Sequence, residues 1–150
     1  MITLIAAMNK KRTIGLKGKM PWHNPEDLKH FKNYTMGKTL FMGRKTYEGL
    51  PKKLKGRNIK VVSNTLDGGV KNFPDILKQG FDEEVIIAGG GEIYKLSLPY
   101  ADKIVLSIIH DNDVLGDTFF PKIPSSFKLT EETVYDTFTL LTYERKEGKR

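Results

Sequence analysis

The chain has no cysteine among its 150 residues, and it has only three histidines. Without cysteine it can form neither a disulfide nor a thiolate metal site, and histidines this scattered do not favour a transition-metal centre. His23 and His30 are expected to face solvent. No apolar run approaches the length of about 20 residues that a membrane-spanning helix needs. Residues 1–8 lack the basic leader and cleavage site of a signal peptide. These absences predict a cytoplasmic protein with no bound metal and no membrane partner.

The formal net charge is +7. Such an excess can indicate nucleic-acid binding, steering of anionic small molecules, or solubility alone. The basic residues are spread along the chain among acidic ones, and they form no recognisable reading helix or aromatic–basic sheet motif. We therefore expect no nucleic-acid partner, and a basic nucleic-acid-binding module stays as the alternative from a different functional class.

Strand-like and helix-like segments alternate along the chain, with no internal repeat and no linker, and the length suits a single domain over residues 1–150. Strands are predicted at 2–8, 39–42, 59–63, 85–88 and 103–109, and helices at 25–35, 44–49, 74–79 and 92–98. The Thr-, Val-, Tyr- and Phe-rich end, 128–145, predicts one or two antiparallel strands. This order indicates an α/β fold around a mainly parallel sheet. Residues 9–24 are predicted to form a long loop, and loops of that length are usually functional or disordered.

The segment 20–32 contains the clearest chemical signal. Asn24 is a good N-cap, and Pro25 suits the first helical position. At about 100° per residue, Asp27 points into the apolar stripe of the helix and not toward its charged side. This acid is either a hydrated capping residue or a proton-handling group whose pKa is raised by burial, and the helix geometry alone leaves both readings open.

Two glycine-containing turns follow predicted strands and precede predicted helices. Gly43 leads into Arg44 and Lys45, and the glycine triplet 89–91 opens the fourth helix. Glycine lets backbone amides approach a phosphate, and the two cations add positive charge. Each turn alone is weak evidence, and the second departs from the dinucleotide fingerprint because Tyr94 takes the place of its third glycine. Two such turns in one small domain make dinucleotide binding more plausible.

Several unlike residues recur here at the fixed offsets of a known family, at Met20-Pro21-Trp22, Pro25, Asp27-Leu28 and Phe31. This pattern resembles dihydrofolate reductase, and the similarity continues through most of the chain. The resemblance implies a central eight-stranded, mainly parallel mixed sheet flanked by four helices. It also implies a monomer that uses NADPH to reduce 7,8-dihydrofolate to 5,6,7,8-tetrahydrofolate and that binds antifolate inhibitors. A reductase of the same fold acting on another pterin or pyrimidine, as in riboflavin biosynthesis, is the nearer alternative.

The resemblance also assigns roles to residues by their position. The catalytic set consists of an acid with its neighbours in the closing loop and on a strand: Asp27, Trp22, Met20 and Ser107. The substrate set adds an apolar slot and an arginine for the substrate carboxylate: Ile5, Ala6, Asp27, Leu28, Phe31, Leu50, Leu54, Arg57 and Ser107. The NADPH set consists of Ala7, Ile14, Gly15, Met20, Gly43, Arg44, Lys45, Thr46, Val62, Ser63, Asn64, Gly90, Gly91, Glu92, Ile93, Tyr94 and Thr118.

Three positions depart from the family pattern. Ala88 stands where relatives often have a larger aliphatic residue, and Glu92 stands where some have an arginine near the cofactor phosphates. Ser107 keeps the hydroxyl of the usual threonine and loses its stiffening methyl group. The resemblance therefore implies an altered pterin pocket and a weaker argument for NADPH over NADH.

Overall fold

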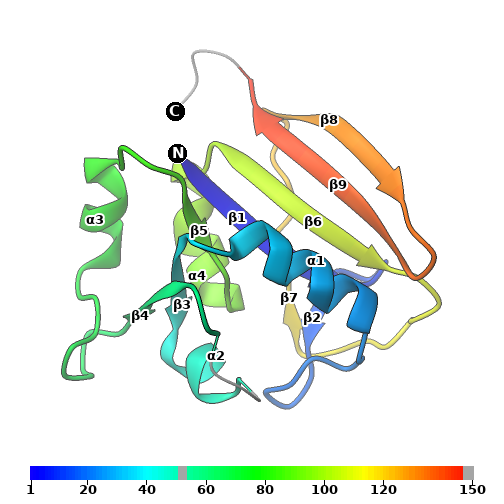
Figure 1. Ribbon diagram of the computed structural model, residues 1–150, viewed down its shortest axis with the longest axis horizontal. Helices are drawn as coiled ribbons and strands as arrows, with labels where there is room; N and C mark the ends of the chain where they lie inside the picture. The colour runs from blue at the N-terminus through cyan, green and yellow to red at the C-terminus, as the bar shows by residue number, and fades with distance from the viewer. Residues whose placement is uncertain (51–53, 147–150) are drawn as a thin grey trace.

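The main sheet is mixed, with a parallel part and an antiparallel edge. A computed structural model describes residues 1–50 and 54–146. Its strands in this sheet are β1 (Ile2–Met8), β3 (Thr39–Gly43), β4 (Asn58–Val62), β5 (Val85–Ile87), β6 (Lys103–Ile109), β8 (Phe127–Val134) and β9 (Phe138–Arg145). They lie in the order β4-β3-β5-β1-β6-β9-β8 (Figure 1). The first five strands in that order are parallel, and β9 and β8 extend the edge in antiparallel pairing. The predicted α/β class and mainly parallel sheet are therefore confirmed.

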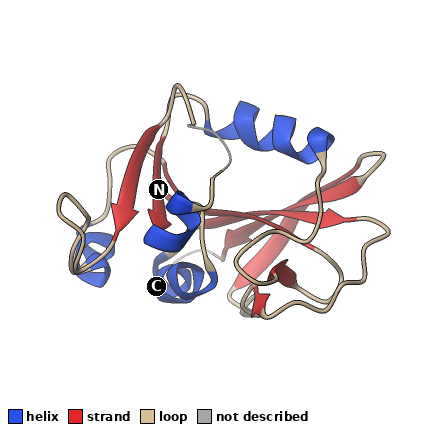
Figure 2. Cartoon of the chain, turned by 90° about the horizontal axis from the view of Figure 1, so that it is seen from below, coloured by secondary structure: helices blue, strands red, loops and turns tan. Residues whose placement is uncertain are grey.

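The described residues form four helices beside this sheet: α1 (Pro25–Thr35), α2 (Arg44–Glu48), α3 (Phe73–Gln79) and α4 (Gly91–Ser97), the last followed by the 3-10 turn η1 (Leu98–Tyr100). Helix α1 lies alone above the sheet in Figure 2, and α3 and α4 lie below it. All four were predicted, with bounds that agree to within about two residues, as expected for helix ends.

Alternation along β1 explains how one strand serves two cores. Leu4 and Ala6 pack on the face covered by α3 and α4, together with Phe73 and Leu77. Ile5 points to the other face and packs with side chains of α1. Successive side chains of a strand point to opposite faces, so a central strand must be apolar almost throughout.

The expected eight-stranded sheet differs from the observed one. In residues 1–50 and 54–146 the main sheet has seven strands, and a separate two-stranded sheet pairs β2 (Thr13–Gly15) with β7 (Thr118–Phe119). The predicted loop 9–24 is thus wrong in part, because it contains β2. The buried Thr13 hydroxyl donates to the carbonyl of Val114 at 2.8 Å, a contact across 101 positions that local pattern cannot show.

None of the helices in the two described ranges is long and apolar enough to cross a membrane.

Candidate active site

Asp27 occupies the first turn of α1 and is only 6% exposed. Asn24 caps the helix as predicted, because its side-chain oxygen accepts the Asp27 N–H at 2.9 Å. Burial raises the pKa of Asp27, and a hydrogen bond to the Ser107 side chain and the nearby His30 ring only partly oppose that rise. The reading of Asp27 as a hydrated capping residue is therefore wrong. The buried acid with a raised pKa is the arrangement that proton-transfer chemistry uses.

An apolar cluster lies between α1 and the sheet beside this acid. It brings together Ile5, Phe31, Leu50 and Leu54, four of the expected slot residues, and Ala88 packs against it as well. These five residues come from four separate parts of the chain, so their grouping reflects the fold and not the spacing.

Two other expected slot residues are placed differently. Leu28, in the first turn of α1, is 44% exposed and does not belong to the buried cluster. The side chain of Ala6 packs in the core on the opposite face of the sheet, so only its main chain can face the slot.

Arg57 precedes β4 and reaches back to the last turn of α1. Its Nη1 donates to the Oγ1 atom of Thr35 at 3.3 Å, and Thr35 is fully buried. Its Nε is buried and has no hydrogen-bond partner among the described residues. The Arg57 guanidinium is therefore fixed through Nη1 and still has an unsatisfied donor at Nε. A guanidinium of this kind suits a bidentate carboxylate ligand.

The loop between β2 and α1 is tied to the segment that precedes β7. Asp117 Oδ2 accepts the Lys17 N–H at 2.9 Å, and the Asp117 N–H donates to the Gly15 carbonyl at 3.0 Å. Farther along the loop, Met20 is 48% exposed. The Trp22 Nε1 is buried and has no partner within the part of the chain that the structure describes. The loop is therefore fixed near its start and carries a free indole donor near its end.

The two predicted glycine turns lie side by side, because β3 and β5 are neighbours in the sheet. The Gly43 N–H donates to the Gly89 carbonyl at 2.8 Å. A Cβ atom added to Gly90 would meet the Thr46 hydroxyl at 3.3 Å, and one added to Gly43 would lie 3.2 Å from Ile93. Larger residues at Gly43 and Gly90 would therefore press on the side chains of Ile93 and Thr46, which would have to shift by a few tenths of an ångström.

The small sheet closes the same region from the other side. A Cβ atom on Gly91 would lie 3.1 Å from Thr118 Cγ2, and one on Gly15 would lie 3.4 Å from Thr118 Cβ. We call this continuous set, Gly15, Gly43, Thr46, Gly90, Gly91 and Thr118, the glycine cradle.

Charge at the glycine cradle is mixed. Arg44 and Lys45 are exposed at the start of α2, and Arg44 Nε pairs with Glu48 at 2.9 Å one turn later. Glu92 is exposed at the start of α4. The N-caps of both helices are glycines that provide no side-chain bond to the first amides. Free amides, two cations and the space left by missing Cβ atoms fit a phosphorylated ligand.

Tyr94 lies between the glycine cradle and the apolar cluster that contains Ile5. Its hydroxyl donates to the Ile5 carbonyl at 2.6 Å, and a Cβ atom on Gly89 would lie 3.1 Å from that hydroxyl oxygen. Tyr94 is buried, so it lies beneath the turn. The neighbouring β1–β6 register places Ala7 opposite Ser107.

The remaining expected cofactor residues lie at two edges of this region. Val62 ends β4, and the Ser63 hydroxyl oxygen that follows accepts the N–H groups of Thr65 and Leu66. The Asn64 side-chain oxygen accepts the Asn72 N–H at 3.1 Å. Ile14 of β2 packs against the main core.

Sequence reasoning misplaced one histidine and missed one threonine. His30 is half-buried, with its ring centroid 5.9 Å from that of Phe138, and burial lowers its pKa. Thr137, in the β8–β9 turn, donates its N–H to Glu26 at 3.0 Å and its hydroxyl to Asn24 at 3.1 Å. Both contacts join residues more than a hundred positions apart, so no local signal could have revealed them.

Comparison with known proteins gives one consistent result. The family described as "Dihydrofolate reductase" matches residues 1–145. Dihydrofolate reductase from Bacillus subtilis is 34% identical and covers 100% of this chain and 98% of its own length. The enzyme from Buchnera aphidicola is 41% identical over 81% of this chain and 79% of its own length.

Among solved structures, dihydrofolate reductase from Enterococcus faecalis complexed with NADP(H) and RAB-propyl superposes with a TM-score of 0.86. It is 32% identical to this chain, and the match covers 98% of this chain and 97% of the other. Sequence, fold and the buried acid on α1 thus agree. The chain belongs to the dihydrofolate reductase family.

Proposed function

We propose that this chain reduces 7,8-dihydrofolate to 5,6,7,8-tetrahydrofolate with NADPH, and so supplies one-carbon metabolism. One observation carries the proposal: the buried Asp27, bonded to Ser107, lies at an apolar cluster that Tyr94 links to the glycine cradle. A cleft with this layout holds an aromatic ring next to a phosphorylated cofactor. The related Enterococcus faecalis enzyme was solved with NADP(H), which supports the choice of cofactor.

Substrate binding divides between the two ends of α1. Asp27 binds the 2-amino and N3 region of the pterin. Arg57, held by Thr35, binds the α-carboxylate at the other end of the substrate. The rings between them contact the apolar residues and main chain of the slot, namely Ile5, Ala6, Leu28, Phe31, Leu50 and Leu54. Antifolates occupy the same slot.

Cofactor binding uses the glycine cradle and its surroundings. Backbone amides, Arg44 and Lys45 neutralise the phosphates, and Val62, Ser63 and Asn64 flank the adenine end. The remaining contacts are Ala7, Ile14, Gly15, Met20, Gly43, Thr46, Gly90, Gly91, Glu92, Ile93, Tyr94 and Thr118. When bound, the cofactor supplies a hydride that passes from C4 of nicotinamide to C6 of the pterin.

The protein itself manages the accompanying proton. Asp27 promotes protonation at N5 through a water molecule, for which the free Trp22 Nε1 is an available donor. Ser107 orients the Asp27 carboxyl group by its hydrogen bond. Trp22 and Met20 exclude bulk water when their loop covers the cleft, which strengthens every electrostatic interaction inside.

The direct test follows the loss of NADPH absorbance when the purified protein is mixed with dihydrofolate. Oxidation of NADPH that depends on dihydrofolate and stops on addition of an antifolate is the expected result. Parallel assays replace NADPH by NADH, and dihydrofolate by a pyrimidine intermediate of riboflavin biosynthesis. Turnover of the pyrimidine without turnover of dihydrofolate would refute the proposal in favour of the neighbouring reductase class.

We further propose that the protein acts in the cytoplasm as a monomer without a nucleic-acid partner. Light scattering at rising protein concentration tests the monomeric state, and a constant mass near 17.1 kDa is expected. Titration with duplex DNA at rising salt tests for a nucleic-acid partner, since a true binder shows a steep dependence of affinity on salt.

A further inference from the structure

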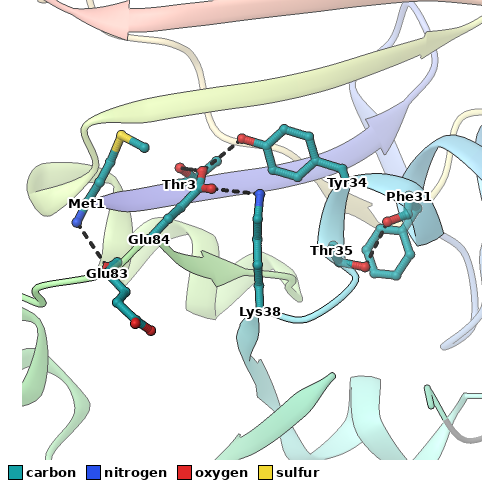
Figure 3. Close-up of polar contacts among 8 residues, drawn as sticks. All are labelled: Met1, Thr3, Phe31, Tyr34, Thr35, Lys38, Glu83 and Glu84. Carbon is teal, nitrogen blue, oxygen red and sulfur yellow. Dashed lines mark hydrogen bonds and ion pairs between the residues drawn. The ribbon is translucent and has the colours of Figure 1, made fainter. Parts of the chain in front are cut away.

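Glu84, just before β5, is the centre of a polar cluster that includes Thr3, Tyr34 and Lys38 (Figure 3). One carboxylate oxygen accepts the Thr3 hydroxyl at 2.6 Å and the Tyr34 hydroxyl at 2.8 Å. The other lies 2.8 Å from Lys38 Nζ. Both oxygens thus have partners within the protein, and the Glu84 side chain is only 17% exposed. We call Thr3, Tyr34, Lys38 and Glu84 the Glu84 clamp.

The clamp joins three parts of the chain that are distant in sequence, because Tyr34 and Lys38 lie only four residues apart. Thr3 belongs to β1, Lys38 precedes β3, Glu84 precedes β5, and Tyr34 is in the last turn of α1. Tyr34 is therefore the member through which the clamp holds α1. Lys38 Nζ also lies 4.1 Å from the centroid of the Tyr34 ring, and Lys103 Nζ lies 5.5 Å from it. Cations over an aromatic face restrict the ring as well as its hydroxyl.

Protonation states keep these bonds in place. Burial raises the pKa of Tyr34, so the phenol stays a donor. Burial also works against ionised Glu84, but its bonds to Lys38, Thr3 and Tyr34 outweigh this and hold its pKa below the usual value. A charged acceptor facing three donors makes hydrogen bonds of the stronger class.

The clamp lies at the amino ends of the parallel strands, and the glycine cradle lies at their carboxyl ends. Helix α1 runs between these two edges, because Asp27 bonds Ser107 near the end of β6 while Tyr34 bonds Glu84 before the start of β5. At a rise of about 1.5 Å per residue, the two contacts are about 10 Å apart along the helix. A shift of the Tyr34 end therefore moves the substrate face of α1 and leaves the cradle unaffected.

The residue next to Tyr34 extends this effect to the substrate carboxylate. Thr35 accepts Arg57 Nη1 at 3.3 Å and donates its hydroxyl to the Phe31 carbonyl at 2.8 Å. The last turn of α1 thus holds the arginine as well as one wall of the apolar slot. At the opposite end of the helix, Thr137 bonds Asn24 and Glu26. The helix is fixed at both ends, and the substrate residues lie between the fixed points.

We propose that Glu84 is a positioning residue for substrate binding, acting through Tyr34 on α1 and Arg57. The inference rests on the proposed function, because the substrate it concerns is dihydrofolate. Release of the clamp weakens dihydrofolate binding and leaves NADPH binding intact. The contact most exposed to this release is the charge-assisted one between Arg57 and the substrate carboxylate, and losing a contact of that kind costs about 10- to 100-fold in affinity.

Trp22, the only tryptophan in the chain, gives a direct probe of both ligands. Quenching of its fluorescence is titrated separately with dihydrofolate and with NADPH. In Glu84→Ala and in Tyr34→Phe, the Kd for dihydrofolate should rise about 10- to 100-fold, and the Kd for NADPH should change by less than about twofold. Glu84→Gln keeps an acceptor for Tyr34 and should recover most of the affinity.

Leu77→Ala is the matched control, since Leu77 is buried on α3 against the opposite core and only 1% exposed. It lowers the melting temperature without touching α1 and should change neither Kd by more than about twofold. A loss of dihydrofolate affinity in Leu77→Ala equal to that in Glu84→Ala would overturn the proposal, because general destabilisation would then explain it. Equal losses for both ligands in Glu84→Ala would overturn it as well.

Hydrogen exchange separates this inference from the proposed function. In Glu84→Ala the amides of α1 should exchange faster than in the wild type, and those of α4 should not. Unchanged exchange in α1 would overturn the clamp whatever the substrate. Wild-type protein that neither binds nor reduces dihydrofolate would refute the proposed function, and with it the substrate named here, while faster exchange in α1 would still show the clamp itself.

Discussion

Asp27→Asn separates the chemical role of the buried acid from its effect on stability. The substitution keeps size and shape and removes the titrating proton. The Ser107 hydroxyl can still donate to the amide oxygen, and the bond from the main-chain N–H of residue 27 to Asn24 does not involve the side chain at all. The helix and its cap are therefore preserved, and a change in activity reports on the carboxyl group.

Asp27→Asn is expected to lower activity strongly and to raise the stability of the folded protein. A positioned acid or base contributes about 10²- to 10⁴-fold to rate, so turnover at neutral pH should fall by that factor. At acid pH the loss should shrink, because the substrate is then protonated before it binds.

The effect on the free energy of unfolding follows from the raised pKa of the Asp27 carboxyl group, which is only 6% exposed. Because its pKa is higher in the folded than in the unfolded protein, its contribution is fully present below the unfolded pKa and is lost as pH rises through the folded pKa. Asparagine shows no such loss. The variant should therefore be the more stable protein at neutral pH, by about 1 kcal/mol or about 2–4 °C in Tm, and the difference should vanish in acid.

The assays are steady-state NADPH oxidation and urea denaturation, both measured on wild type and variant across the acid-to-neutral range. Unchanged turnover at neutral pH would remove Asp27 from the mechanism. A stability difference independent of pH would refute the assignment of a raised pKa, even if activity were lost.

Three further substitutions address the other parts of the site and the core. Arg57→Ala should weaken dihydrofolate binding by about 1.5–3 kcal/mol and leave NADPH affinity nearly unchanged; equal losses in fluorescence titrations would contradict its role. Gly90→Ala places a Cβ atom 3.3 Å from the Thr46 hydroxyl, so it should weaken NADPH binding about tenfold at constant dihydrofolate affinity; calorimetric titration that finds no change would argue against the cradle. Leu77→Ala should lower the free energy of unfolding by about 2–5 kcal/mol in urea denaturation, and a cost below about 1 kcal/mol would mean that this core relaxes around the cavity.

The sequence predicts best what short-range patterns determine. Helix α1 and its cap were predicted from Asn24, Pro25 and the position of Asp27, and the structure reproduces all of these features. The central strands β1 and β6 were predicted with their observed bounds, because strands buried on both faces are apolar almost throughout. In each case the signal lies within about ten consecutive residues.

Errors occur where the decisive partner is distant along the chain. Strand β2 has only three residues, and its partner β7 is distant along the chain, so local pattern does not distinguish β2 from the predicted loop 9–24. His30 is expected to face solvent, yet the ring of Phe138 in β9 packs against it. Helical periodicity gives the direction of a side chain but not what packs over that side. The resulting burial of the His30 ring also lowers its pKa.

The position of the buried Asp27 depends both on local sequence pattern and on residues that are distant along the chain. The motif that identifies the family lies within residues 20–31, but the orientation of α1 depends on Thr137 at one end and Glu84 at the other. Neither residue belongs to the motif. A relative can thus keep every motif residue and still bind substrate differently if it lacks these contacts. Strands β3 and β5 have the clamp residues Lys38 and Glu84 just before their first residues and the cradle at their carboxyl ends, so the proposed substrate and cofactor contacts depend on different ends of the same strands. Substrate affinity can therefore change in such relatives while cofactor affinity stays constant.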